Sequence, residues 1–375
     1  MQWFESYLAD RLFRAQIESK RSPPTSVRPF GVPQGSVLGS LLFVISQNDL
    51  PEATPNPASG QSVCYVDDDS EQESNKDPEQ LQIALQTRTN NTTQWLMDNM
   101  MVVAPKKTKL IVSATRELRA ARPIINPVRL KVGEVTVEPT QSEKLLGVVI
   151  DQDLTWRSHL WGETWREGKN WPGVFAQLLR RLGLLKHLAK ISSRTKMVSF
   201  IPALFTSKVL YALPLPLIAN IWGLQSYRVT EPNKFSTTQH DIRRLQSLQR
   251  QAGLLVRPPE PGAEPVPTEH LLQSLNWLSV HQLGAMTILT KAIMTVRTGK
   301  PAFIADRLTP ANQTRTAKNQ LVIPRCRLNL SLEGFTNQAA RLYNALPDNI
   351  KREPDKRRLK ANLKKWISHN IQPKV

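Results

Sequence analysis

The segment Gly31–Phe43, which reads GVPQGSVLGSLLF, constrains the fold of this chain most. Its first nine residues contain three glycines and one proline. Glycine adopts backbone angles that other residues avoid and proline fixes one angle, so the segment predicts a tight, specialised turn. Ser36 can cap the helix that follows. Apolar residues then recur at helical spacing, which predicts one buried face: Val37, Leu38, Leu41, Leu42 and Ile45.

This turn has two interpretations. Its bare backbone allows a ligand to approach the main chain closely, and the side-chain amide of Gln34 can contact a base or a phosphate. Alternatively, the segment is an ordinary glycine-rich loop ahead of a core helix. The segment alone does not decide between them.

The charge balance favours a polyanionic partner. The 375 residues include 50 Lys or Arg against 31 Asp or Glu, a net charge of +19. A field of this sign favours nucleic acid first and an anionic membrane surface second, with a basic protein lacking any polymer partner as the alternative. Residues 197–224 are apolar, but Lys208 and three prolines interrupt them, so we expect buried helices there and no membrane span.

The cysteines and the first residues indicate the compartment. Cys64 and Cys326 cannot form a disulfide framework, and their spacing fits no zinc motif. The first residues are charged and do not resemble a signal peptide. We therefore expect an intracellular protein, in the nucleus or the cytoplasm, that is not secreted.

Periodicity and turn signals predict mixed structure in the first 160 residues and mostly helices beyond Trp156. The expected elements are a helix over residues 3–12, a loop or strand over 20–29, a Pro-rich turn over 50–61, strands over 62–66 and 108–114, a helix over 78–100, a hairpin turning at Gly133 and a strand broken at Gly147. A Pro-rich linker is expected at residues 257–267.

Three adjacent acids, Asp67, Asp68 and Asp69, end the strand predicted over residues 62–66, which we expect to be buried. Adjacent carboxylates repel one another, so a cation or solvent must relieve them. Side chains alternate along a strand, so neighbouring acids face opposite sides. Sites of phosphoryl transfer hold divalent metals with such carboxylates. The alternative is a solvated acidic turn, which Glu71 and Glu73 extend.

The order of these pieces resembles the palm of reverse transcriptases, most closely those of non-LTR (LINE-type) retrotransposons. GVPQGSVLGSLLF is followed after about twenty residues by YVDD at a strand end, as in the family motifs G-x-P-Q-G-S-x-L-G-P-L-L-F and Y/F-x-D-D. WLMDNMMVVAPKKTKLIV is similar to the next palm segment, and SEKLLGVVIDQDLTWRSH to the primer-grip hairpin. LNWLSVHQ and EGFTNQAARLYNALPDNI are similar to the helical C-terminal part of such proteins.

The resemblance implies an α+β fold, with a partial right-hand polymerase palm followed by a mostly helical thumb and C-terminal region. The palm is an antiparallel sheet with helices. The implied regions are a partial palm at 1–115, a primer-grip-like β region at 116–160, a helical thumb-like region at 161–256, the Pro-rich linker at 257–267 and a helical basic region at 268–375.

The resemblance also implies roles for individual residues. Asp67 and Asp68 would be catalytic and hold Mg²⁺, with Asp67 the more directly committed ligand. The nucleotide and template pocket would comprise Gln34, Gly35, Ser36 and Tyr65, and the primer grip Leu146, Gly147 and Val148. Lys107 or Lys109 would contact the pyrophosphate side, or else is ordinary surface charge. The implied partners are an RNA template, a DNA primer or an RNA/DNA hybrid, and a dNTP, with no membrane.

Departures from the family pattern limit the expected activity. A palm of this type needs a further aspartate on a strand ahead of Gly31, but Asp10 is the only aspartate there and lies in an expected helix. The fingers are missing too, so the chain is expected to begin inside the palm. Ser40 stands where the family usually has proline. The residues after YVDD are polar, so we expect a frayed hairpin.

We therefore expect a retrotransposon RNA-directed DNA polymerase domain that is inactive alone, its missing parts lying on another chain or upstream. The alternatives are a non-catalytic, basic nucleic-acid-binding remnant and a pseudogene product. Residues 351–375 contain nine Lys or Arg and two acids. This basic tail can contact a phosphate backbone, act as a nuclear-import signal, or form an ordinary solvated helix.

Overall fold

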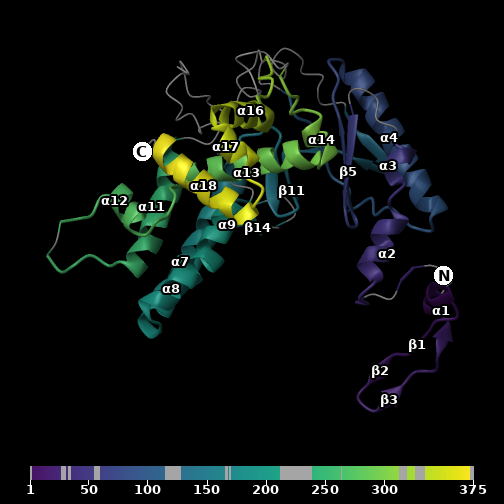
Figure 1. Ribbon diagram of the computed structural model, residues 1–375. Coiled ribbons are helices and arrows are strands. Elements are labelled where there is room, and N and C mark those ends of the chain that lie inside the picture. The colour runs from purple at the N-terminus through teal and green to yellow at the C-terminus, as the bar shows by residue number, and fades with distance from the viewer. Residues whose placement is uncertain are drawn as a thin grey trace. The chain divides into compact units, whose positions relative to one another are not determined.

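The computed structural model describes residues 2–26, 31–32, 35–54, 60–114, 128–164, 168, 170–211, 239–262, 264–311, 319–325 and 334–371 (Figure 1). The chain divides into two compact units, Met1–Gln141 and Ser142–Val375. The boundary falls inside the β region expected at 116–160. Both units combine helices with small two-stranded sheets, in agreement with the α+β class. The five implied functional regions stay a prediction.

The first unit is built around one long helix, α4 (Pro78–Asp98), as the periodicity predicted. The carboxylate of Asp77 caps its start by accepting a hydrogen bond from the Glu79 backbone N–H at 3.0 Å. The other elements are α1 (Gln2–Leu8), β1 (Leu12–Phe13), β2 (Gln16–Ile17), β3 (Lys20–Arg21), β4 (Thr25–Ser26), α2 (Gly39–Ser46), α3 (Leu50–Ala53), β5 (Gly60–Tyr65), β6 (Asp68–Glu73), β7 (Leu110–Ile111), β8 (Leu130–Val132), β9 (Val135–Val137) and β10 (Pro139–Thr140).

The core of this unit lies between α4 and the hairpin β8–β9, which turns at Gly133 as expected. Leu81 and Leu85 of α4 pack against Leu130, Val132 and Val137 of the hairpin. The described strands pair two by two: β1–β4, β2–β3, β5–β6 and β8–β9 are antiparallel, and β10–β7 is parallel. A continuous palm sheet is not found among the described residues, so the palm itself stays a prediction.

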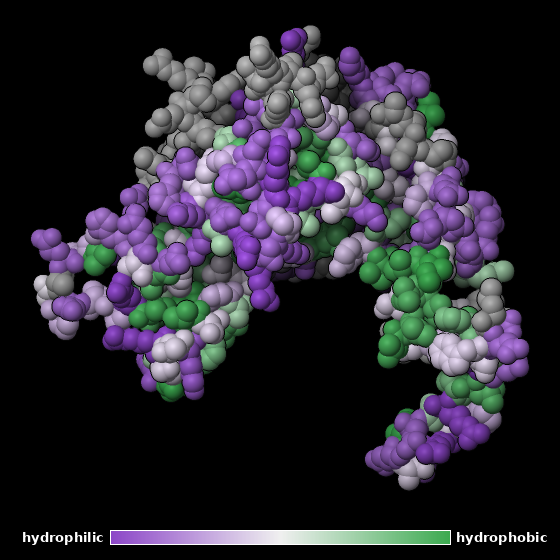
Figure 2. All heavy atoms as spheres, in the orientation of Figure 1, coloured by the Kyte–Doolittle hydropathy of each residue, from purple (hydrophilic) through white to green (hydrophobic). Residues whose placement is uncertain are grey.

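Helix α2 follows the glycine-rich turn as predicted, but its predicted burial is wrong. Val37 is 98% exposed, and Leu41 and Ile45 are more than half exposed. Figure 2 shows hydrophobic side chains gathered on the surface over α2. Periodicity located the helix correctly, but burial also needs an opposing element, and the described residues leave these side chains uncovered. Helix α1 ends at Leu8 and is shorter than the helix expected over residues 3–12. Its side chains are also exposed or half-buried.

The turn before α2 keeps the unusual backbone that its glycines predicted. Gly31 and Gly35 have φ angles of +88° and +80°, which side chains rarely adopt. The predicted cap is wrong, because Leu38 occupies the N-cap position and Ser36 makes no capping hydrogen bond. Gln34 lies outside the described residues.

The second unit is mostly helical beyond Trp156, as predicted. Its elements are β11 (Ser142–Leu145), β12 (Val148–Asp151), α6 (Arg157–Trp161), β13 (Glu163–Thr164), β14 (Asn170–Trp171), α7 (Gly173–Ile191), α8 (Arg194–Ile201), the π-helix η2 (Pro202–Thr206), α9 (Ser207–Leu210), α11 (Gln239–Val256), α12 (Thr268–Ser274), α13 (Val280–Thr298), α14 (Ala302–Ala305), α16 (Phe335–Ala345), α17 (Asp348–Arg352) and α18 (Lys356–Asn370).

Two clusters of buried side chains hold this unit together. Leu178, Ile201, Phe205 and Leu245 represent the first, which joins α7, α8, η2 and α11. The second joins α13, α16 and α18 and includes Leu363. The predicted linker at 257–267 is a loop between α11 and α12, both of which belong to this unit. Among the helices of the described ranges, none combines the length and the apolar character that a membrane span requires.

A buried histidine connects the hairpin β11–β12 to the helices. His159 accepts a hydrogen bond from the Val149 backbone N–H at 3.3 Å through Nδ1, and its ring stacks on Trp171 at a centroid distance of 5.8 Å. Burial, assisted by the nearby Lys208 ammonium, lowers the pKa of His159 from 6.5 to about 4. Below pH 6.5 the unfolded chain therefore binds a proton on His159, whereas the folded chain binds this proton only near pH 4 and below.

We expect the free energy of unfolding to fall as the pH drops from 6.5 to 4, by on the order of 3 kcal/mol from this group. His159→Gln should flatten that dependence, whereas His187→Gln, at an exposed position on α7, should not. Urea unfolding at pH 7.5 and pH 5 measures both. An unchanged pH dependence in a folded His159→Gln protein would contradict this assignment.

Candidate catalytic hairpin and nucleic-acid interface

The YVDD motif lies at the tip of a regular hairpin. Strands β5 and β6 pair antiparallel over six residue pairs, from Gly60 with Glu73 to Tyr65 with Asp68. Val66 and Asp67 form the two-residue turn between them. The expected fraying is therefore wrong, because the polar side chains of β6 do not interrupt the backbone ladder, and two of them, Glu71 and Glu73, have partners on α4.

The turn is strained at Val66. Its φ angle is +58°, a left-handed conformation that is unfavourable for a β-branched side chain by about 1–2 kcal/mol. The side chain is 49% exposed, so packing does not account for the conformation. Strain of this kind persists only where the surrounding structure holds it, and it is often found at functional sites.

The three aspartates have different surroundings. Asp67 and Asp68 are exposed at the tip, and Tyr65 beside them is 61% exposed. The expected burial of this strand end is therefore wrong. Asp69 instead accepts hydrogen bonds from the Ser62 hydroxyl at 3.3 Å and the Cys64 thiol at 3.2 Å. The pair Asp67 and Asp68 is thus the part of the acidic run that is open to a ligand.

A buried ion pair fastens the hairpin to α4. Arg88 donates from Nε to Oε1 of Glu73 at 2.7 Å, and the two side chains are only 3% and 2% exposed. Gly60, opposite Glu73 in the hairpin, has no room for a side chain, because an added Cβ would collide with both partners. The sequence patterns did not indicate this pair. The available signal was Arg88, the single charged residue between Glu79 and Asp98 of the helix, within the polar stretch QTRTNNTT.

A second contact beside it is sensitive to protonation. Thr92 donates from its hydroxyl to Glu71, and burial raises the pKa of Glu71 from 4.5 to about 7. The folded hairpin keeps a proton that the unfolded chain has lost, so stability from this group is lost as the pH rises from 4.5 to 7. Burial, together with the hydrogen bond to Asp69, also raises the pKa of the Cys64 thiol to about 12. Cys64 is therefore a neutral thiol at physiological pH.

The two candidate phosphate-binding lysines, Lys107 and Lys109, lie within and just after one tight turn. Both are exposed, and the backbone N–H groups of Lys107 and Thr108 donate hydrogen bonds to the Ala104 carbonyl oxygen within this turn. The strand β7 follows directly. The predicted order of helix, lysine–threonine turn and strand is therefore confirmed, whereas the role of either lysine stays a prediction.

The segment expected as a primer grip forms a second hairpin. Strands β11 and β12 pair over four residues, and Leu146 and Gly147 form the turn with φ angles of +47° and +80°. Both positive angles are typical of a type I′ turn. Val148 is buried at the start of β12. Tyr211 donates from its hydroxyl to the Leu146 carbonyl oxygen, which fixes the turn against α9.

Cations gather beside this second hairpin. The ammonium groups of Lys144 and Lys208 lie 5.1 and 5.5 Å from the ring centroid of Trp171. Burial lowers the pKa of Lys208, and the positive charges of Arg181 and Lys144 lower it further. A partly buried cluster of like charges attracts an anion, and a phosphate of a nucleic acid fits that requirement.

The structure therefore brings the candidate residues together in groups. Tyr65, Asp67 and Asp68 share the first hairpin, and Leu146, Gly147 and Val148 share the second. Gly35 and Ser36 precede α2. Within the described residues, no group of three or more His, Cys, Asp or Glu side chains is placed to hold a metal ion. Any metal at the first hairpin would need further ligands besides its two exposed carboxylates.

The strained turn gives a direct test of the hairpin geometry. Val66→Gly should slow amide hydrogen exchange in residues 63–70, because glycine adopts the positive φ angle without strain and stabilises the hairpin by about 1 kcal/mol. Val63→Gly, at a similarly exposed position within β5, should speed exchange there. Faster exchange in the Val66→Gly protein would contradict the strained turn.

Comparison with known proteins identifies similar sequences. The chain is similar to the probable RNA-directed DNA polymerase from transposon BS of Drosophila melanogaster, with 32% identity over 168 residues, which is 43% of this chain and 18% of the relative. It is similar to the probable RNA-directed DNA polymerase from transposon X-element, with 25% identity over 255 residues, 67% of this chain and 24% of the relative. The RNA-directed DNA polymerase from mobile element jockey is 26% identical over 162 residues, 42% of this chain and 17% of the relative. The X-element and jockey proteins are also from Drosophila melanogaster.

These matches cover about a quarter or less of the length of each relative. No family model matches the chain, and no solved structure matches it. The resemblance to reverse transcriptases of non-LTR retrotransposons, expected from the ordered motifs, is confirmed, and the chain contains a reverse-transcriptase-like region.

Proposed function

We propose that this chain supplies the metal-holding hairpin and the primer-contacting surface of an RNA-directed DNA polymerase. The observation that carries the proposal is the hairpin β5–β6, whose turn presents Asp67 and Asp68 to solvent while α4 holds its other end. The similarity to proteins named RNA-directed DNA polymerases supports the same reaction. The substrates would be an RNA template, a DNA primer and a dNTP.

The donor set at the hairpin tip fits Mg²⁺. Magnesium prefers oxygen ligands and is commonly held by one or two carboxylates together with waters and substrate phosphates. Asp67 would be its principal ligand, with Asp68 less directly committed. The ion, when bound, would polarise a phosphate oxygen and make the primer hydroxyl a better nucleophile. The two carboxylates alone hold it weakly, so the complete site would draw on a carboxylate or phosphates from elsewhere.

The other candidate residues would bind the substrates. The open backbone at Gly35 and Ser36, with Gln34 and the exposed ring of Tyr65, would form the pocket for the incoming nucleotide and the template base. The turn Leu146–Gly147 would contact the primer. The cation cluster at Lys144 and Lys208 supports that role, because it lies beside this turn and favours a phosphate backbone. Lys107 or Lys109 would neutralise the pyrophosphate.

A second candidate function is nucleic-acid binding without catalysis. One observation favours it. The described residues bring together only two carboxylates at the hairpin tip, fewer ligands than a polymerase metal site requires. The cations around Trp171 and the basic face of α18 would serve this function equally well. The two functions share their partner and differ in whether the hairpin tip holds a metal ion for catalysis.

Hybrid binding tests the partner that both functions share, and primer extension tests whether the chain is active alone. We expect the purified chain to bind an RNA/DNA hybrid but not to extend its primer with Mg²⁺ or Mn²⁺, because the described residues place only two carboxylates at the hairpin tip. Lys144→Gln and Lys208→Gln should each lower the slope of log affinity against log salt by about one, and Lys196→Gln, exposed on α8, should not.

Three outcomes would change this account. Extension that Asp67→Asn abolishes would contradict the expected inactivity and establish the metal site. Failure of the folded chain to bind the hybrid at low salt would contradict both functions. Equal salt slopes for Lys144→Gln and Lys196→Gln would exclude the second hairpin as the primer contact.

A further inference from the structure

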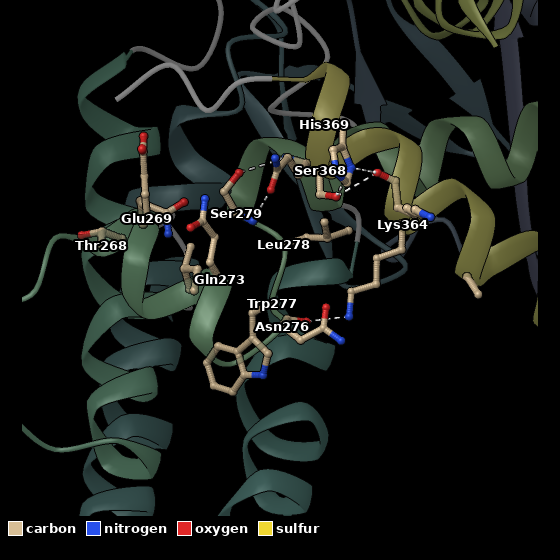
Figure 3. A pocket seen from close by; sticks show the side chains of 15 residues that line it. Thr268, Glu269, Gln273, Asn276, Trp277, Leu278, Ser279, Lys364, Ser368 and His369 are labelled. Atoms are coloured by element: carbon tan, nitrogen blue, oxygen red, sulfur yellow. Dashed lines mark hydrogen bonds between the residues drawn. The ribbon is translucent and has the colours of Figure 1, made fainter. Parts of the chain in front are cut away.

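A pocket of about 660 Å³ lies within the second unit, away from both hairpins in sequence (Figure 3). The helix α12 forms one wall, the turn between α12 and α13 forms the floor, and α18 forms the opposite wall. Its volume is within the range of small-molecule sites. The site residues that the reverse-transcriptase resemblance implies do not line it, although its floor belongs to LNWLSVHQ, a segment similar to the C-terminal part of that family.

The base of the pocket is fixed by paired polar groups. Ser279 and Gln282 form a capping box at the start of α13, and Gln282 also donates from Nε2 to the Ile371 carbonyl oxygen at 2.8 Å. Gln246 accepts a hydrogen bond from the Val280 backbone N–H at 3.0 Å. These groups are already satisfied, so the pocket is preformed and a ligand is not needed to hold it open.

The sides of the pocket differ in chemistry. The half-buried indole of Trp277 and the buried side chain of Leu278 give an apolar surface on the turn. Lys364 and Lys365 line the α18 wall, and Lys364 donates from Nζ to the Asn276 carbonyl oxygen at 2.5 Å, as Figure 3 shows. The helix α18 contains six Lys or Arg and no acidic residue.

The pocket also carries one acidic side chain, Glu269, on the α12 wall. An anionic group would therefore lie against α18, and the uncharged part of the same ligand would lie toward Trp277 and α12. Gln273 on α12 adds an exposed side-chain amide that can bond a polar edge. These pocket walls suit a ligand in which a flat aromatic ring with polar edges is joined to a phosphate.

We propose that the pocket binds one nucleotide of a single-stranded nucleic acid, with its base stacked on Trp277 and its phosphate paired with Lys364 and Lys365. Stacking on an aromatic side chain is favourable for every base, and a lysine ammonium binds phosphate oxygen as a point charge. The choice of a polymer as ligand rests on the proposed function. A free nucleotide has the same chemistry, so the experiment separates the two sources.

The first arm uses a free nucleotide. Binding of 5-fluorouridine monophosphate is followed by fluorine NMR on the full chain. Lys365→Glu should weaken binding at least tenfold, because it places a carboxylate against the phosphate. The matched control Lys360→Glu makes the same charge change at another exposed position on α18 that does not line the pocket, and should alter the affinity less than twofold.

The second arm uses a single-stranded DNA dodecamer and an abasic strand of the same length and charge. The full chain should bind the normal strand roughly tenfold or more tightly than the abasic strand, since stacking is worth about 1–3 kcal/mol per base. Trp277→Leu should remove that preference without changing the salt slope, and Trp277→Phe should retain most of it. Thermal melts check that the variants fold, because Trp277 also packs against the core.

The outcomes are distinct. Base-dependent binding of the strand without saturable binding of the free nucleotide identifies a polymer as the ligand, and saturable binding of both shows that one nucleotide suffices. Equal effects of Lys365→Glu and Lys360→Glu, or a base preference that survives in a folded Trp277→Leu protein, would overturn the proposal. Both lysine variants are also measured on the dodecamer, so if Trp277→Leu does not fold, this pair of variants decides alone. Because hybrid binding through Lys144 is measured separately, failure here leaves the proposed function standing.

Discussion

The buried ion pair between Arg88 and Glu73 is the interaction on which the first unit depends. Both side chains are almost excluded from solvent, so loss of either partner would leave an uncompensated charge and cost about 3–5 kcal/mol. The same helix holds the other hairpin as well, because Gln86 accepts from the Lys131 backbone N–H and donates to the Lys131 carbonyl oxygen, both at 2.8 Å. Helix α4 is thus the frame that positions the hairpins β5–β6 and β8–β9.

This arrangement separates the rigid and the exposed ends of the hairpin β5–β6. Its base is fixed by Arg88, by Thr92 and by the close approach at Gly60, whereas its tip carries two exposed aspartates on a strained turn. A site for phosphoryl transfer benefits from this separation, because the carboxylates must stay in place while substrate phosphates and metal ions come and go. The hairpin β11–β12 differs, because Tyr211 holds its turn directly at Leu146.

Local patterns in the sequence predicted the local structure. Apolar spacing located α4, glycine located the turn at Gly133, and alternation separated Asp68 from Asp69. The strand break expected at Gly147 is the turn of the hairpin β11–β12. What could not be predicted depends on partners that are distant in sequence. The predicted burial of α2 was wrong because burial needs an opposing element, which the sequence pattern of the helix does not reveal. The Arg88–Glu73 pair joins a helix to a strand across 15 residues. The pocket beside Trp277 is held by contacts such as that between Gln282 and Ile371, 89 residues apart, which no periodicity reveals.

The central claim is that the tip of the hairpin β5–β6 holds a divalent cation. Paramagnetic line broadening by Mn²⁺ in amide NMR spectra of the full chain tests it most directly, because broadening reports distance from the bound ion whether or not a primer is extended. We expect the amides of residues 66–68 to broaden first, excess Mg²⁺ to restore them, and Asp67→Asn to abolish the effect while the hairpin stays folded. Unchanged signals at residues 66–68, or broadening that persists after Asp67→Asn and Asp68→Asn together, would contradict the claim.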